Sequence, residues 1–494
     1  MCKCKRMSAL LLAALLLLSS CAGGARDETT AAGTPQTAQT PAETETSEAT
    51  PEYPDKKWDG YTFNILISGN TENNWKKDDF KADEQNGEVL NDARYLRNQA
   101  VGEQFGITVN TIEKYGSTKG QGDGYQLISK SVMAGDNAYD AAMICVYDAA
   151  NLACSGNLRD LNSLPYTDLS KPWWDQKANA DMTIKGRMFF TTGDISTADN
   201  DATGCYLFSK KLITDYALDD PYALVRDGKW TFDKMTSMAS SVSADLNGDG
   251  KMDSSDRFGA IVWDDSIMGA VNGTLGKCAH INDSGELELT LYTERIFDMI
   301  DRYTSYIYTK DVCYNYQRVS YDITTPVSMF ASGQSLFFMQ LLDLTSYFRD
   351  METDFGVLPA PKYDEAQEDY GHTIGSWHSL FLCVPAVIAD EERTGAVLEA
   401  LAYQGQQLVT PAYYEKTLKG KYFRDDESSE MLDIILSTRV YDLGWYFQIG
   451  LYNDEILYLV YNSDKDFASR YAKNESLAAE DIKRVNEAFT ATMG

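Results

Sequence analysis

One short segment carries acidic and amide side chains at a spacing that suits a hard metal ion. Residues 245–256 read D-L-N-G-D-G-K-M-D-S-S-D, with oxygen donors at positions one, three, five, nine and twelve and a glycine at position six. Ligands in this order, completed by the backbone carbonyl at position seven, wrap around Ca²⁺. Four carboxylates in one turn would repel one another without a cation. The sequence therefore predicts a structural calcium site, with ligands from Asp245, Asn247, Asp249, Lys251, Asp253 and Asp256.

The residues around this loop match only part of a helix–loop–helix calcium site. Residues 231–243 can form the entering helix, but 258–263 reads as a strand, so a second helix is not expected. The loop resembles dockerin calcium loops, yet dockerins carry two copies and this chain has one, so a cellulosome role is not expected. Aspartate at position twelve is shorter than the usual glutamate, which weakens binding. A metal-free turn rich in Asp and Asn is the alternative.

Residues for catalysis are scarce. The chain has no H-E-x-x-H, G-x-S-x-G or G-x-x-x-x-G-K-[ST] motif, and the glycines of 120–124 lack dinucleotide-binding spacing. His280, His372 and His378 are its only histidines, which leaves few bases for a Ser–His or Cys–His site. We therefore predict a protein without enzymatic activity. A secreted polysaccharide hydrolase that uses two carboxylates is the alternative, since 74 acidic residues are present.

The first residues have the features of a secretory signal. Basic residues precede an apolar run at 7–18 that is too short to span a membrane. The following Leu18-Ser19-Ser20-Cys21 resembles the lipobox of bacterial lipoproteins. This resemblance implies a signal peptide at 1–20, lipidation of Cys21 and attachment to the extracellular face of the cell membrane through that lipid. Residues 21–57 are rich in Thr, Ala, Pro and Glu, and we expect a disordered tether.

Residues 58–494 are numerous enough for two domains. Their composition limits which classes of partner the protein can bind. The formal net charge of −30 repels nucleic-acid phosphates, which excludes a nucleic-acid partner. The 31 Tyr and 8 Trp combine flat apolar faces with polar tips, which suits sugar rings, although most aromatic side chains pack in cores. No C-x-x-C pair follows Cys21, which argues against zinc. A Cys145–Cys154 disulfide and buried free thiols both remain open.

Strand-like and helix-like segments alternate after the tether. Residues 61–68, 107–114 and 139–146 read as strands, while 86–105 and 125–134 have helical spacing of apolar residues. Strands separated by helices of this length favour an α/β fold with a parallel sheet and crossover helices. Ligands of such sheets bind at the carboxyl ends of the strands.

Five further segments occur in order along the chain: M-A-G-D at 133–136, N-L-R-D-L-N at 157–162, G-K-W-T at 228–231, F-A-S-G-Q-S-L-F at 330–337 and F-G-V-L-P-A-P-K at 355–362. Together they resemble segments of the family 1 extracellular solute-binding proteins, in particular clostridial members. The resemblance covers most of the chain after the tether, and the lipobox agrees with it.

This resemblance implies the type II periplasmic-binding-protein fold, in which two α/β lobes close on a ligand by a hinge motion. We expect lobe one to comprise 58–190 plus 335–400, and lobe two to comprise 191–334 plus 401–494, including the calcium loop 245–256. The chain is expected to cross between the lobes near 188–206 and to return near 334–340.

The same resemblance implies a function. Such a protein captures a small solute, expected to be a carbohydrate, and delivers it to the permease subunits of an ABC importer. We expect a monomer, and a surface sensor or adhesin is a further alternative. Members of this family line the cleft with aromatic side chains that stack on sugars and polar side chains that bind hydroxyls. The expected ligand contacts are Trp377 and Trp263 first, then Asp194, His378, Trp174 and Trp445.

Overall fold

The computed structural model describes residues 49–72, 75–116, 119–349, 351–416 and 426–491. These residues belong to one compact unit, Ala49–Gly494. The expected signal peptide, the lipidation site Cys21 and the tether up to residue 48 lie outside the described residues. Within the described ranges, no helix combines the length and the apolar character needed to cross a membrane.

The folded unit begins earlier than the sequence suggested. Residues 49–57 contain no helix or strand. However, the ring of Tyr53 packs edge-on against Phe105, with ring centroids 5.4 Å apart, and Lys56 pairs with Glu392 at 3.1 Å. The expectation that the tether extends to residue 57 is therefore wrong, because partial burial of an aromatic ring holds this segment against the folded body.

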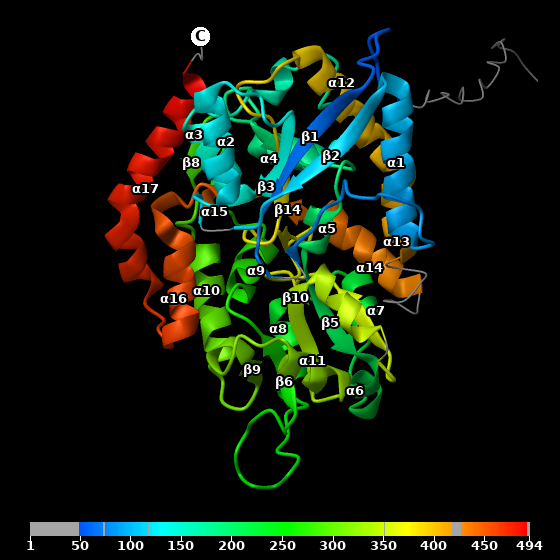
Figure 1. Cartoon of the computed structure of the whole chain (residues 1–494). Coiled ribbons are helices and arrows are strands. Elements are labelled where there is room, and N and C mark those ends of the chain that lie inside the picture. Colours follow the sequence, from blue (N-terminus) through cyan, green and yellow to red (C-terminus); the bar gives the residue numbers. More distant parts are fainter. Residues whose placement is uncertain (1–48, 73–74, 117–118, 350, 417–425, 492–494) are drawn as a thin grey trace, which may run out of the picture. The chain divides into compact units, whose positions relative to one another are not determined.

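The first sheet has the strand order β2-β1-β3-β13-β4, and Figure 1 labels the first three of these strands. Its strands are β1 (Tyr61–Ser68), β2 (Ile107–Glu113), β3 (Ala141–Cys145), β13 (Leu380–Cys383) and β4 (Phe190–Thr191). As predicted, β1 pairs in parallel with β2 and β3. β13 runs antiparallel between β3 and β4, so a segment far along the chain completes this lobe.

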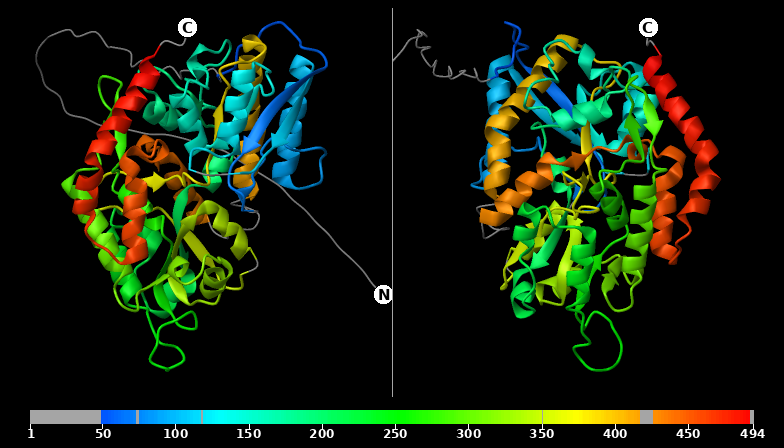
Figure 2. Two further views of the ribbon diagram at one scale, coloured as in Figure 1. Left: turned by 60° about the vertical axis from the view of Figure 1, so that its left-hand side comes forward. Right: turned by 180° about the vertical axis from the view of Figure 1, so that it is seen from behind.

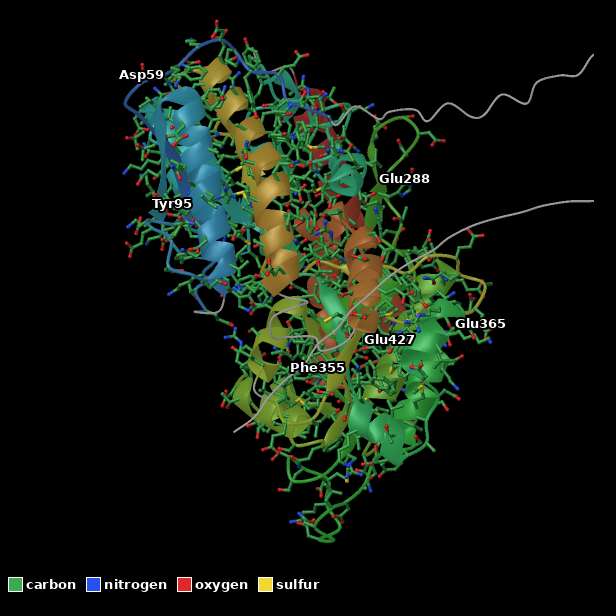
Figure 3. The ribbon with its side chains drawn as sticks, turned by 90° about the vertical axis from the view of Figure 1, so that its right-hand side faces the viewer. Asp59, Tyr95, Glu288, Phe355, Glu365 and Glu427 are labelled. Carbon is green, nitrogen blue, oxygen red and sulfur yellow. The ribbon has the colours of Figure 1, made fainter. Side chains whose placement is uncertain are left out.

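Four helices cover the two faces of the first sheet: α1 (Val89–Phe105), α12 (Glu391–Gln404), α2 (Asp123–Ala134) and α3 (Val146–Cys154). α1 and α12 lie side by side (Figure 3), and α2 contacts α3. Phe63 and Ile65 of β1 share a core with α1 and α12, whereas Leu66 belongs to the core that contains α2 and α3. Successive residues of a strand point to opposite faces, so this doubly covered strand needs apolar residues at consecutive positions.

The second sheet has the order β11-β5-β10-β6-β9. Its strands are β5 (Gly204–Ser209), β6 (Phe258–Val262), β9 (Cys313–Asn315), β10 (Ser335–Leu341) and β11 (Phe355–Leu358). Helices α8 (Phe232–Ser240), α10 (Glu294–Ile307) and α11 (Thr324–Ala331) contact β6, β9 and β10 respectively. β10 runs parallel to β6 and antiparallel to β5.

The strand pairing moves two expected lobe boundaries. Residues 335–400 were expected in lobe one, but β10 and β11 both pair with β5 and so belong to the second sheet. The return expected near 334–340 is therefore wrong. The chain returns between β11 and β13, through β12 (His372–Thr373), which pairs with β14 (Arg439–Val440). The first crossing runs from β4 through α5 (Ala198–Asp201) to β5, within the expected range.

The C-terminal part does not belong wholly to lobe two. Residues 405–414 pack on α1 of lobe one, where Val409 and Tyr413 share a small core with Leu90. The last helix, α17 (Phe467–Thr490), contacts α3 of lobe one and also α10 of lobe two (Figure 2). The expected assignment of 401–494 to lobe two is therefore wrong. Residues 405–414 pack on lobe one, and α17 packs on helices of both lobes.

His372 of β12, in the segment where the chain returns to lobe one, makes the stability of the protein depend on pH. Its Nε2 accepts a hydrogen bond from the Ala360 N–H at 3.0 Å, and burial lowers its pKa to about 3. Unfolded histidine titrates near pH 6.5, so its contribution to stability is complete above pH ~6.5 and is lost as the pH falls towards 3, at about 1.4 kcal/mol per pH unit. In urea unfolding between pH 6.5 and 4, we expect His372→Gln to lose stability less steeply than wild type. Equal slopes would contradict this role.

Candidate functional site

A cavity of about 600 Å³ lies where strands of both sheets end. Trp75 and Tyr147 line it after β1 and β3 of the first sheet, and Trp263 and Tyr316 line it after β6 and β9 of the second. In open α/β sheets, the carboxyl ends of parallel strands form the ligand crevice. The volume falls within the roughly 300–1,000 Å³ of small-molecule sites. The two lobes therefore form one site between them.

Besides residues within 340–347, two further segments contribute to the walls of this interlobe cavity. One is the crossing segment 373–378, and the other is α16 (Tyr452–Asn462), which packs on α9 (Ser266–Gly273) of lobe two. Asp454 of α16 pairs with Lys119 of lobe one. α16 therefore contacts groups from both lobes at the edge of the cavity.

Aromatic side chains form much of the wall. The Trp75 ring lies 4.4 Å from the His378 ring, and the Trp263 ring lies 5.9 Å from the same His378 ring. Trp377 meets Tyr147 at a centroid distance of 6.1 Å. These rings combine flat apolar faces with polar edges, which fits the alternating apolar faces and hydroxyl rims of sugar rings.

Two adjacent carboxyl groups follow β6 and line the cavity. The Asp264 N–H donates to Gln317 Oε1 at 2.7 Å, and the Asp265 N–H donates to Asp264 Oδ1 at 2.9 Å. The Tyr461 hydroxyl of α16 donates to the Asp264 carboxylate. Burial, followed by the neighbouring charge of Asp264, raises the pKa of Asp265, and burial also raises the pKa of Asp264. The pair can accept hydrogen bonds from hydroxyl or amino groups of a ligand.

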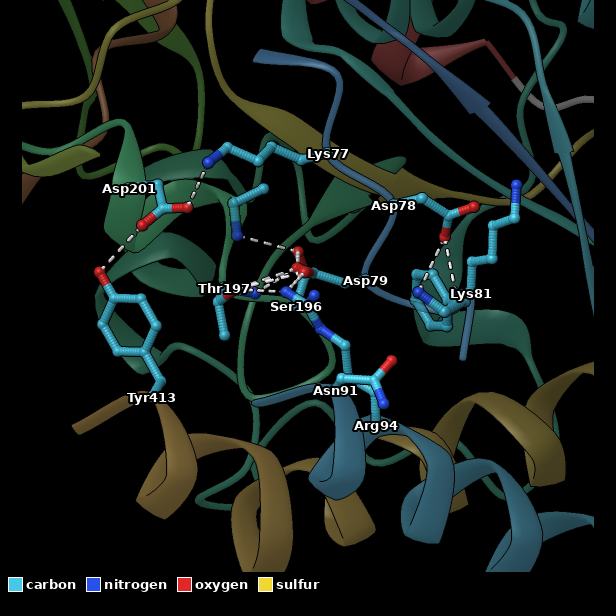
Figure 4. A network of polar contacts seen from close by, with 12 residues as sticks. Lys77, Asp78, Asp79, Lys81, Asn91, Arg94, Ser196, Thr197, Asp201 and Tyr413 are labelled. Carbon is cyan, nitrogen blue, oxygen red and sulfur yellow. Dashed lines mark hydrogen bonds and ion pairs between the residues drawn. The ribbon is translucent and has the colours of Figure 1, made fainter. Parts of the chain in front are cut away.

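A polar network fixes the loop after β1 beside the cavity. Lys77 of this loop pairs with Asp201 of α5 at 3.1 Å and with Asp343, a cavity residue of lobe two, at 2.6 Å. Buried Asp79 accepts hydrogen bonds from residues 196–197 of the first crossing (Figure 4). The loop after β1, which carries Trp75 of the cavity wall, is therefore bonded to the first crossing and to lobe two.

Three of the six residues expected to contact the ligand line the cavity: Trp263, Trp377 and His378. They come from different elements, since Trp263 follows β6 while Trp377 and His378 belong to the crossing segment before β13. Burial lowers the pKa of His378 to about 4, so this imidazole is neutral near pH 7. The structure thus brings these three side chains together.

The other three expected contacts lie away from the cavity walls. Trp174 is 1% exposed, and its indole N–H donates to Glu399 at 2.9 Å. Trp445 is also 1% exposed and belongs to the main apolar core. Asp194 accepts a hydrogen bond from Thr410 at 2.6 Å. These side chains serve packing and internal hydrogen bonds in this structure, which corrects their interpretation as cleft residues.

Sequence reasoning missed several cavity residues. Tyr147, Asp264 and Asp265 lie just beyond strands that the sequence did indicate, and Trp75 lies in the loop that follows another such strand. The rule that ligands bind at strand carboxyl ends could have selected them. No local signal marks α16, because it lines the cavity only through packing between distant segments.

The expected calcium loop 245–256 projects from lobe two between α8 and β6 (Figure 1). Asp245 accepts hydrogen bonds from the N–H groups of Gly248 and Gly250, and Asp256 accepts one from Leu246. Among the described residues, no group of three or more His, Cys, Asp or Glu is gathered closely enough to hold a metal ion. Calcium binding at this loop therefore stays a prediction.

Comparisons with known proteins bear on the fold. No protein-family model and no curated protein matches the chain, whereas many solved structures do. An ABC substrate-binding protein from Listeria monocytogenes in complex with cycloalternan matches with a TM-score of 0.52 and 13% identity, over 89% of this chain and 100% of its own. An ABC transporter solute-binding protein from Agrobacterium radiobacter K84 in complex with ribitol matches with a TM-score of 0.53 and 12% identity, over 87% and 100%.

A third structure, UgpB from Mycobacterium tuberculosis in complex with glycerophosphocholine, matches with a TM-score of 0.54 and 17% identity, over 79% of this chain and 95% of its own. These similarities confirm the expected α/β fold of the two-lobed periplasmic binding proteins. The three bound ligands differ chemically, so the fold itself does not select the solute.

Proposed function

We propose that this protein is an extracellular solute-binding protein that captures a small solute, a carbohydrate, and delivers it to an ABC importer. The observation that carries the proposal is the interlobe cavity, which is formed by the strand ends of both sheets and walled by Trp75, Trp263 and Trp377. Two lobes joined by separate crossing segments can close on a ligand by a hinge motion. Such closure would bury the solute between these rings.

The chemistry of the walls supports a carbohydrate. Indole and phenol rings can cover the apolar faces of a sugar, and carboxylates such as Asp264 can accept hydrogen bonds from its hydroxyls. The similar structures from Listeria and Agrobacterium hold cycloalternan and ribitol, both rich in hydroxyl groups. A cavity of this composition serves binding without requiring a catalytic group.

The proposal includes a membrane anchor. Lipidation of Cys21 after removal of residues 1–20 would hold a monomer at the extracellular face of the cell membrane, next to the permease subunits. Metabolic labelling with a clickable palmitate analogue tests this, because wild type should carry the label in the membrane fraction. Cys21→Ser should lose the label, and retention of the label by this variant would contradict lipidation at Cys21.

Thermal melting against a glycan panel tests the proposed binding function. A ligand that binds only the folded state adds about 2.7 kcal/mol at 100 times its Kd, which gives a clear rise in Tm. We expect residues 22–494 to respond to one class of glycan while chromatography of the same samples shows the glycan intact. Turnover of the glycan would instead favour the polysaccharide hydrolase, and the absence of any shift across the panel would argue against a carbohydrate-binding protein.

We also propose that loop 245–256 binds Ca²⁺ in a structural role. The ligand spacing supports this, and binding would draw together carboxylates that repel one another. We expect EGTA to lower the Tm of wild type and Ca²⁺ to restore it, while a variant with Asp245→Asn and Asp249→Asn melts alike in both conditions. Asp283→Asn, which removes an exposed charge from another loop, is the control and should respond like wild type. An unchanged wild-type Tm after complete metal removal would refute the site.

A further inference from the structure

The charges on the walls of the interlobe cavity are strongly unbalanced. The described residues that line it include five carboxylates, one lysine and no arginine. Two of the carboxylates have cationic partners, because Asp343 pairs with Lys77 and Asp454 pairs with Lys119. The remaining three are Glu72, Asp264 and Asp265. The cavity therefore has an excess of negative charge that its own cations do not balance.

The excess concentrates at the Asp264–Asp265 pair. Asp264 is only 6% exposed, and neither residue forms an ion pair with any described lysine, arginine or histidine. The hydrogen bonds to Asp264 come from neutral groups, namely the Tyr461 hydroxyl and the Asp265 N–H. Removing a carboxylate from water is costly unless a cation or several donors replace the water. Lys119 is the one cavity cation whose charge acts on the pair, and it already forms an ion pair with Asp454. The pair therefore has no counter-charge of its own among the described residues.

Aromatic rings surround this pair. Tyr316, Tyr321 and Trp263 line the same wall. The charge of Asp264 contributes, after burial, to raising the pKa of both Tyr316 and Tyr321, which reflects how close the two phenols lie to it. A cation next to a carboxylate and over the face of an aromatic ring gains from both contacts. The wall thus combines the two kinds of group that recognise an organic cation.

We propose that the solute is a glycan that bears a protonated amine, which lies against Asp264 and Asp265 while its sugar rings cover the cavity tryptophans. This rests on the proposed function, and it names the chemical class of the solute. Beside a neutral sugar the pair would hold a proton, because burial raises the pKa of Asp264 to about 6 and that of Asp265 to about 8. A ligand cation would instead stabilise the ionised carboxylates, and an anionic sugar would be repelled by them. An amino sugar supplies the cation, together with hydroxyls and flat apolar faces for the remaining walls.

Three trisaccharides with the same β-1,4 backbone distinguish the contribution of the amine to binding from that of the sugar rings. They are the trimers of glucosamine, N-acetylglucosamine and glucose. In isothermal titration calorimetry at pH 7, we expect the mature chain to bind the glucosamine trimer at least about 10-fold more tightly than the other two. Raising the salt concentration should reduce this preference, because screening weakens charge attraction. Salt should leave the weaker binding of the neutral trimers nearly unchanged.

Variants locate the effect at the acidic pair. Asp264→Asn and Asp265→Asn keep the side-chain size and remove the charge, so each should lose most of the preference for the amine. The ratio of the Kd values for the glucose and glucosamine trimers, measured on the same variant, reports this loss separately from any general weakening of glycan binding. Asp283→Asn removes a charge from an exposed loop outside the cavity and should behave like wild type. The Tm of each variant shows that it is folded, and the wild-type salt dependence stands independently of the variants.

Two outcomes would overturn the inference. Equal or tighter binding of the neutral trimers would exclude a cationic solute while leaving carbohydrate capture in place. Failure of the glucosamine trimer to bind, with a response to another glycan in the melting panel, would also reject the amine and keep the proposed function. Failure of the entire panel would reject both.

Discussion

Replacing Trp377 by alanine is expected to weaken solute binding about 30-fold or more while leaving the folded protein nearly as stable as wild type. Trp377 is only partly buried and lies on the crossing segment, where its ring faces the cavity and Tyr147. Tryptophans at the centre of binding sites cost about 2 kcal/mol or more when truncated. At about 1.4 kcal/mol per tenfold change in Kd, this corresponds to the stated loss. Calorimetric titration with the glycan found in the melting panel measures it.

Trp445→Ala provides the matched control, because it removes the same side chain from the core. Trp445 lies in α15 (Leu443–Tyr446), is 1% exposed and does not line the cavity. Truncating a buried tryptophan costs about 3–5 kcal/mol of the free energy of unfolding. We expect this variant to melt earlier but to bind with an unchanged Kd while folded. Wild-type affinity in Trp377→Ala, or equal loss of affinity in both variants, would contradict the placement of the site.

Replacing Arg439 by methionine is expected to lower the free energy of unfolding by about 3–5 kcal/mol. Arg439 of β14 pairs with Asp175 and with Asp199 of α5, and it donates a hydrogen bond to Asn200 at 2.6 Å. The three charged side chains are only 11%, 10% and 2% exposed, in that order. Methionine fills a similar volume but leaves two buried carboxylates without their cationic partner. Urea unfolding followed by circular dichroism measures the loss.

The pH dependence of this loss gives a second check. Burial raises the pKa of Asp199 to about 6, and the charge of Arg439 opposes this rise. Without Arg439 the pKa of Asp199 rises further. The folded variant then binds a proton at Asp199 up to a higher pH than the unfolded chain does, so its free energy of unfolding falls as the pH increases. The difference from wild type should therefore be larger at pH 8 than at pH 6. Arg226→Met, which breaks exposed pairs with Glu427 and Glu430, should cost at most about 1 kcal/mol. Similar losses in both variants would contradict the argument.

Local sequence patterns were sufficient for the first half of lobe one and insufficient for the lobe boundaries. The strands at 61–68, 107–113 and 141–145 alternate with helices, and this order alone favours a parallel sheet. By contrast, β10 is an apolar strand buried on both faces, and such a strand fits the centre of either sheet equally well. Its pairing with β5 depends on contacts across more than a hundred residues, which no local pattern contains.

The tryptophans show the same limit at the site. Trp263 and Trp377 line the cavity, whereas Trp174 and Trp445 fill the core, although all four have the same side chain and lie near strand ends or turns. Residue type alone cannot separate these roles, because the same apolar ring suits a core and a sugar-binding wall. Trp263 can be recognised as a cavity residue because it lies at the carboxyl end of β6. Trp377 can be recognised only from the path that residues 373–378 take between the lobes.

Titration of the intrinsic tryptophan fluorescence with the glycan panel tests most directly whether the interlobe cavity captures a solute. Three of the 8 tryptophans line the cavity, so closure of the lobes around a ligand must change their emission. We predict a saturable change with one-to-one stoichiometry for one class of glycan, no product in the same samples, and loss of the change in Trp377→Ala. No saturable change with any glycan, or a change that Trp377→Ala retains in full, would contradict the assignment of this cavity as the solute-binding site.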